Sequence, residues 1–177
     1  MFLRKAFFLG ALLFVQFYSQ GQSVLWASKV VAFSSEYSDQ LLGKEFRALH
    51  ALGRPSKYPK FGNTASAWQS LTPDNPKGEY LIVSFDSLKQ IKQVVVFENF
   101  GAGSLTRIEA FDENNKLYML REFPPNYAQS NGQITRIKLN SLTPFKVKSI
   151  KITLNSERVK GFSQIDAIAI SDDDKPI

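Results

Sequence analysis

Apolar and polar residues alternate along much of the chain, most clearly beyond residue 79. Ile150, Ile152 and Leu154 are separated by single polar residues, and a period of two gives a β-strand one buried face and one solvent face. The same pattern predicts strands at residues 29–34, 81–85, 91–97, 105–111, 117–123, 134–139, 149–154 and 165–170. About eight short strands joined by turns are typical of an all-β fold, a two-sheet antiparallel β-sandwich.

Three of these segments also indicate their place in the fold. Residues 91–97 are apolar on both faces, so we expect a central strand with a loop packed over its outer side. Residues 105–111 and 117–123 flank Asp112-Glu113-Asn114-Asn115-Lys116. Asn and Asp tolerate turn geometry, so this arrangement predicts a hairpin.

The segment from Ser38 to Leu52 has a different period. Its apolar residues recur at roughly helical spacing, and we expect one short helix or helical turn near residues 38–52, although Gly43 weakens the pattern. A long loop follows at residues 53–77 and contains Tyr58, Phe61 and Trp68. Loops of this length inside a domain are usually functional or packed as caps.

The amino terminus has the three-part layout of a secretory signal peptide. Arg4 and Lys5 precede an apolar run, and Ser19 and Gly21 place small residues before a cleavage point. We therefore predict a signal peptide at 1–21, one sandwich domain at 22–171 and a flexible acidic tail at 172–177. Export to the periplasm, the outer surface or the medium follows. The alternative, an uncleaved anchor, would need about 20 apolar residues.

Composition excludes several functions. The chain has no cysteine, one histidine and a formal charge of +6, and its Lys and Arg residues are dispersed instead of forming the basic face that nucleic acid requires. The charge supports only a mild attraction to anionic polymers. His50 is accompanied neither by a nucleophile motif, which a catalytic triad would need, nor by the further His or Cys ligands that a zinc site would need. We expect no enzyme activity and no cofactor; a structural calcium ion is the alternative, without a dense run of acidic ligands to favour it.

Several strings in the second half resemble a known group of modules. They are Glu79-Tyr80-Leu81-Ile82-Val83-Ser84-Phe85, Ile91-Lys92-Gln93-Val94-Val95-Val96-Phe97-Glu98-Asn99, Leu105-Thr106-Arg107-Ile108-Glu109-Ala110-Phe111-Asp112 and Ile165-Asp166-Ala167-Ile168. Their order resembles the galactose-binding-like jelly roll of discoidin and coagulation-factor type C modules. Residues 51–55 and 67–68 are similar to versions found in bacterial envelope proteins. The resemblance implies a ligand site on loops at one end of the sandwich and a last strand that pairs near the amino-terminal strand.

Polar residues at strand ends have an expected structural role. Glu98, Asn99 and Asp166 each stand at or near the end of a predicted strand. A carboxylate or amide in such a position can accept hydrogen bonds from loop N–H groups that would otherwise be unpaired.

The long loop and the connection after residue 123 combine aromatic and planar polar side chains. A sugar site needs a flat aromatic ring for the apolar face and amide or guanidinium groups for the hydroxyls. The candidate ligand-binding residues are Arg54, Tyr58, Asn63, Trp68, Asn126 and Tyr127. The alternative for Trp68 and Tyr58 is that they plug the open end of the sandwich as part of its core.

Three functions remain open at this point. The first is a non-catalytic module that recognises a carbohydrate or envelope glycan. The second is a protein-interaction or assembly subunit of the bacterial cell envelope. The third is a hydrolase whose carboxylates the sequence does not distinguish from structural ones.

Overall fold

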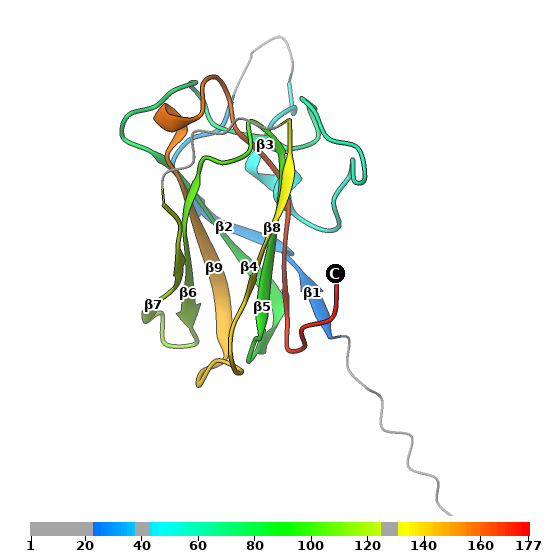
Figure 1. The fold of residues 1–177 in the computed structure, drawn as a ribbon, viewed down its shortest axis with the longest axis vertical. Coiled ribbons are helices and arrows are strands. Elements are labelled where there is room, and N and C mark those ends of the chain that lie inside the picture. The colour runs from blue at the N-terminus through cyan, green and yellow to red at the C-terminus, as the bar shows by residue number, and fades with distance from the viewer. Residues whose placement is uncertain (1–22, 38–42, 125–130) are drawn as a thin grey trace, which may run out of the picture.

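Alternating segments of the sequence become strands in the computed structural model, which describes residues 23–37, 43–124 and 131–177 (Figure 1). The strands are β1 (Val24–Trp26), β2 (Lys29–Phe33), β3 (Trp68–Gln69), β4 (Glu79–Lys89), β5 (Gln93–Phe100), β6 (Leu105–Asp112), β7 (Leu117–Glu122), β8 (Gln133–Lys138), β9 (Val147–Leu154) and β10 (Gln164–Ser171). All eight predicted strands are present. β1 and β3 were not predicted, because segments of three and two residues are too short to show a period.

The strands form two antiparallel sheets of five strands each. One sheet has the order β1-β10-β5-β8, with β3 paired to β10, and the other has the order β2-β4-β9-β6-β7. Leu81, Ile150 and Ile168 lie in the dry interior between the sheets and are fully buried. Burial of a side chain of this size stabilises the fold by roughly 1.5–3 kcal/mol. The predicted antiparallel sandwich is confirmed. β10 pairs with β1, whereas the predicted opening strand, β2, pairs with β4 in the other sheet.

β5 is the central strand that its sequence predicts. It lies between β10 and β8, and all its residues except the last are buried. Its outward residues Val95 and Phe97 join Ala167 of β10 in a second apolar cluster on the outer face of the sheet. The expected loop over this face is present, because the Tyr58 ring packs edge-on against Phe97 with 5.7 Å between ring centroids.

The helical turn expected near residues 38–52 is a single 3-10 turn, η1 (Ala48–Ala51), within the part of this segment that the structure describes. Gly43 and Phe46 have positive φ angles of 69° and 59°. Such angles end a right-handed helix, so the turn does not extend back toward residue 43. Its buried alanines, Ala48 and Ala51, pack into the core beside Trp68.

The acidic tail 172–177, predicted to be flexible, lies against the sheet in the structure. Gln93 donates hydrogen bonds to two backbone carbonyls of the tail, at 2.9 and 2.8 Å, and Ile177 packs on the outer cluster. The hydrogen bond from Lys92 and the charge of Lys92 lower the pKa of Asp174 from its ordinary value. The interaction between these two groups is therefore lost as the pH falls through that lowered pKa.

The connections gather at two ends of the sandwich. The segments 43–67, 70–78, 101–104 and 155–163 lie at the upper end in Figure 1, whereas the turns 90–92 and 113–116 lie at the lower end. Among the described residues, no helix is long and apolar enough to cross a membrane. The upper end is therefore the place to look for the loop site that the resemblance implies.

Gly101 provides a test of how the upper end is packed. Its φ is +58°, and a Cβ added there would lie 2.1 Å from the backbone oxygen of Phe162. We expect Gly101→Ala to lower the free energy of unfolding by about 2 kcal/mol or more, because backbone strain and a clash with main chain combine. Urea denaturation measures the loss.

Gly53→Ala is the matched control for this substitution. Gly53 also has a positive φ, of +78°, but an added Cβ would meet nothing within 4 Å. Gly53→Ala should therefore lower the free energy of unfolding by only about 1 kcal/mol, from backbone strain alone. Equal losses in the two variants would contradict the close packing of the 101–104 and 155–163 connections.

Candidate functional site

Tyr58 is the most exposed aromatic residue of the long loop. Its ring packs edge-on against Phe61, at 6.3 Å between centroids, and against Phe97 of β5, at 5.7 Å. The residue nevertheless remains 53% exposed. Tyr58 therefore covers the outer cluster with part of its ring and leaves the remainder available to a ligand.

Asp166 of β10 fixes the backbone just before Tyr58. Its carboxylate accepts hydrogen bonds from the Ser56 N–H and the Ser56 hydroxyl, both at 2.8 Å, and from the Lys57 N–H at 3.2 Å. Asp166 is only 2% exposed. The predicted role of Asp166 as an acceptor for loop N–H groups is confirmed, and it joins a segment 110 residues earlier in the chain to the last strand.

Gln164, two residues before Asp166, fixes the other end of the same loop. Its carbonyl oxygen accepts a hydrogen bond from the Thr64 N–H at 3.0 Å, and its amide nitrogen donates to the side-chain oxygens of Asn63 at 2.7 Å and Gln69 at 2.6 Å. Gln164 is fully buried, whereas Asn63 is exposed. The hydrogen bond from Gln164 thus orients the side-chain amide of Asn63, and Asn63 remains accessible to solvent.

Glu98 and Asn99 act at the end of β5 as the sequence predicts. Glu98 accepts hydrogen bonds from the Gly103 N–H at 3.0 Å and from the side chain of Gln133 at 2.7 Å. Asn99 donates through its amide to the backbone oxygen of Gly62 and accepts from the Gly62 N–H at its own backbone oxygen. These bonds hold the 101–104 turn and the loop 54–66 against the same strand end.

Arg54 lies at the opposite end of a row of aromatic rings from Phe61. It lines a depression of about 260 Å³ together with Trp26 of β1 and Ile177. The Trp26 ring contacts Phe97 at 5.8 Å between centroids, and Phe97 contacts Tyr58. Arg54 and Tyr58 are therefore placed over one face of the sheet, with two other rings between them.

Trp68 has a different place from the one expected of a ligand-binding residue. It is 0% exposed, it packs in the main core, and its indole N–H donates to the Ser35 backbone oxygen at 3.0 Å. A ring without an accessible face cannot stack on a sugar, so Trp68 is removed from the candidate site. The alternative reading, a core residue at the end of the sandwich, describes it correctly.

The two other predicted residues, Asn126 and Tyr127, lie outside the described residues. The connection that contains them reaches the loop surface at its far end, because Gly132 packs against the Phe61 ring. A Cβ added at Gly132 would lie 2.4 Å from Phe61 Cδ1. Gly132, at the described end of that connection, therefore lies against the long loop.

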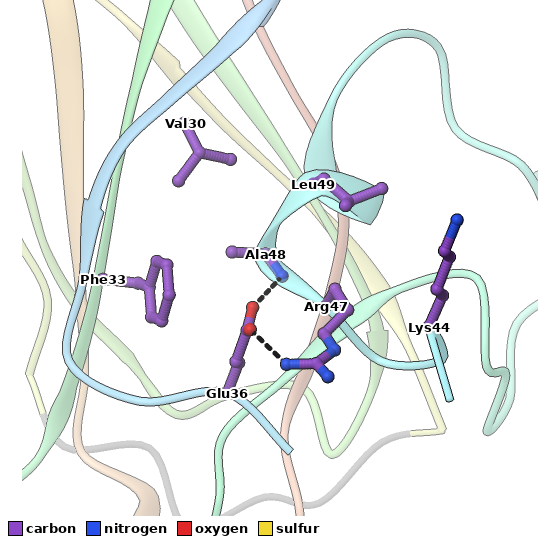
Figure 2. Close-up of a pocket in the computed structure, with 7 residues that line it drawn as sticks. All are labelled: Val30, Phe33, Glu36, Lys44, Arg47, Ala48 and Leu49. Carbon is purple, nitrogen blue, oxygen red and sulfur yellow. Dashed lines mark hydrogen bonds and ion pairs between the residues drawn. The ribbon is translucent and has the colours of Figure 1, made fainter. Parts of the chain in front are cut away.

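A second concave surface, which the sequence did not reveal, lies beside β2 (Figure 2). We call it the β2 groove; it has a volume of about 480 Å³ and is lined by Val30, Phe33, Glu36, Lys44, Arg47, Ala48 and Leu49. Simple alternation would place Val30 and Phe33 on opposite faces of the strand. A β-bulge in the pairing between Val30 and Ala32 inserts one residue and brings both side chains to the groove.

Candidate metal and catalytic centres are sparse in the part of the chain that the structure describes. No group of three or more His, Asp or Glu side chains there could hold a metal ion. His50 contacts the Lys44 backbone oxygen at 2.8 Å through Nε2. This bond ties together the loop that forms one wall of the β2 groove.

Comparison with known proteins identifies the fold. No protein-family model and no curated protein sequence matches the chain. The family 32 carbohydrate-binding module from Streptococcus pneumoniae EndoD matches with a TM-score of 0.58 and 10% identity, over 82% of this chain and 95% of that chain. The family 32 module from C. perfringens NanJ, solved in complex with galactose, matches with a TM-score of 0.57 and 16% identity, over 83% and 98%.

The same fold also occurs in a protein of another kind. A chain in the structure of reduced XRCC1 bound to the DNA polymerase β catalytic domain matches with a TM-score of 0.63 and 10% identity, over 85% of this chain and 99% of that chain. These likenesses confirm the galactose-binding-like sandwich that the sequence strings indicate. At such identities they describe the fold, and function has to be argued from the site.

The hydrogen bonds to Asp166 make the position of the loop at Ser56 and Lys57 depend on one carboxylate, which a substitution can test. We expect Asp166→Asn to lower the free energy of unfolding by about 1–3 kcal/mol, because an amide cannot accept the three hydrogen bonds equally well in a buried position. Hydrogen exchange at the Ser56 and Lys57 amides should accelerate at the same time.

Asp86→Asn is the control, since Asp86 is exposed on β4. It should leave both the unfolding free energy and the exchange of the loop amides unchanged. Protection of Ser56 and Lys57 that survives in Asp166→Asn would show that the loop is held by other contacts.

Proposed function

We propose that this protein is an exported, non-catalytic carbohydrate-binding module that recognises a glycan through the loop 54–66. The observation that carries the proposal is the placement of Tyr58, an aromatic residue 53% exposed on a loop that the buried Asp166 holds in place. An exposed ring on a fixed loop is what stacking against a sugar requires.

The chemistry of the neighbouring groups fits the same ligand. A pyranose ring presents an apolar C–H face, which packs on an aromatic face, and hydroxyls, which pair with planar polar groups. Asn63 supplies an exposed amide that Gln164 orients, and Arg54 supplies an exposed guanidinium beside Trp26. Because the loop is fixed before binding, little conformational entropy is lost when a ligand arrives.

The comparisons support this proposal at the level of the fold. Several of the matching structures are family 32 carbohydrate-binding modules, and one of these was solved with galactose. The predicted signal peptide at 1–21 would bring the module to the cell envelope or the medium, where glycans are the abundant polymers.

A second candidate function is the binding of a protein of the cell envelope. The likeness to the XRCC1 chain in its complex with the DNA polymerase β catalytic domain favours it, because that complex is one between proteins. The two functions predict different results. A protein partner would copurify without added sugar, whereas a free glycan would compete for a site that binds glycans.

Substitution of Tyr58 tests the glycan proposal. On a glycan array followed by titration calorimetry, Tyr58→Ala should weaken binding of the best ligand about tenfold, because the stacking surface is lost. Tyr58→Phe keeps the ring and should retain most of the affinity. The free energy of unfolding should change little, since Tyr58 is 53% exposed.

Leu71→Ala is a matched control, because Leu71 is an exposed apolar residue, at 50%, outside the loop 54–66. It should leave binding unchanged. Affinity that is the same in Tyr58→Ala and the unmodified chain would exclude Tyr58 from the site, and an array without any bound glycan would refute the proposed function itself.

A further inference from the structure

The β2 groove combines apolar walls with a polar end. Phe33 and Val30 form one wall, and Leu49 and Ala48 of the η1 turn lie opposite (Figure 2). Phe33 is 38% exposed and Leu49 is 55% exposed, which leaves much of both side chains open to solvent. A volume of about 480 Å³ lies within the range of roughly 300–1,000 Å³ that is usual for small-molecule sites.

The polar end of the groove is held rigidly by an ion pair. Arg47 donates through Nη1 to Glu36 Oε1 at 2.7 Å, and the Ala48 N–H donates to Glu36 Oε2 at 2.8 Å. Arg47 also donates through Nη2 to the Gly43 backbone oxygen at 3.3 Å. A guanidinium has five N–H donors, so an oriented Arg47 retains donors for a ligand.

Lys44 adds a positive charge that Glu36 does not balance. Its side chain lies across the groove from Phe33 (Figure 2). Among residues 23–37, 43–124 and 131–177, its ammonium makes no ion pair, in contrast with Arg47. With two cations and one carboxylate in its lining, the groove favours a ligand that carries negative charge.

We propose that the β2 groove is a second binding site of this module, specific for a saccharide that bears an anionic group. The sugar ring packs on Phe33, Arg47 donates to its hydroxyls, and Lys44 pairs with the carboxylate or sulfate. This inference rests on the proposed function in that it gives the module a second glycan contact, but it uses none of the residues of the loop 54–66.

Two other occupants fit the groove less well. An extended peptide would add to the free edge of β2, but the bulge at Val31 interrupts the regular row of hydrogen-bonding groups there. An acyl chain would be covered poorly, because the groove is open along its length and one end holds the Glu36–Arg47 pair. A sugar ring with hydroxyls and one negative charge uses the Phe33 ring, the Arg47 donors and the Lys44 charge together.

The test compares oligosaccharides that share one neutral backbone and differ in charge. Neutral, carboxylated and sulfated forms are titrated by calorimetry against the full mature chain and against Lys44→Gln, Phe33→Ala and Tyr58→Ala. Lys44→Gln should weaken binding of the charged forms about fivefold and leave the neutral form unaffected. Phe33→Ala should weaken the charged forms about tenfold. Changes in the NMR chemical shifts of the Val30 and Ala48 amides show whether the ligand lies in the β2 groove. The difference in affinity between the carboxylated and sulfated forms shows which anion the site prefers.

Lys146→Gln removes the same charge from an exposed lysine at the opposite end of the sandwich and should have no effect. Equal affinity for charged and neutral forms, or a preference that survives both Lys44→Gln and Phe33→Ala, would overturn the second site. Binding that depends on Tyr58 alone would overturn it while leaving the proposed function intact. A chain that binds none of the forms would overturn both.

Discussion

Burial of β10 on both faces is the constraint on which the rest of the structure depends. Its inward residues Ile165, Ile168 and Ile170 close the core against the opposite sheet, and its outer side lies under the loop 54–66. Polar groups in such a position must find partners. Gln164 and Asp166 therefore bind the loop backbone and side chains, and the bonds that make the strand stable also fix the loop that presents Tyr58.

Much of this arrangement could be read from the sequence, because it follows from local periodicity. Alternation located all eight longer strands, and the two-sided apolar character of residues 91–97 identified the central position of β5. Asp166 was recognisable as an acceptor because a carboxylate in an apolar strand has few other uses. The sequence left Trp68 open between a ligand contact and a core residue, since an aromatic residue in a long loop has the same sequence signature whether it faces the core or solvent.

The β2 groove shows what periodicity leaves out. It depends on a bulge that changes which face Phe33 occupies, on positive φ angles at Gly43 and Phe46, and on Glu36 reaching across to Arg47 and the Ala48 N–H. Each of these is a tertiary choice between backbone paths of similar local energy. A single sequence therefore predicts the sheets well and the surfaces between loops poorly, although recognition depends on those surfaces.

The first and last described residues are neighbours. Ser23, Val24 and Ile177 line one depression, and Val24 pairs with Ser171 across β1 and β10. A short peptide could therefore bridge the two ends of the domain, and new ends could be opened in the 113–116 turn at the same pole of the sandwich. The order of strands in space would be kept while their order along the chain changes, which makes the domain suited to circular permutation and to insertion within a larger host protein.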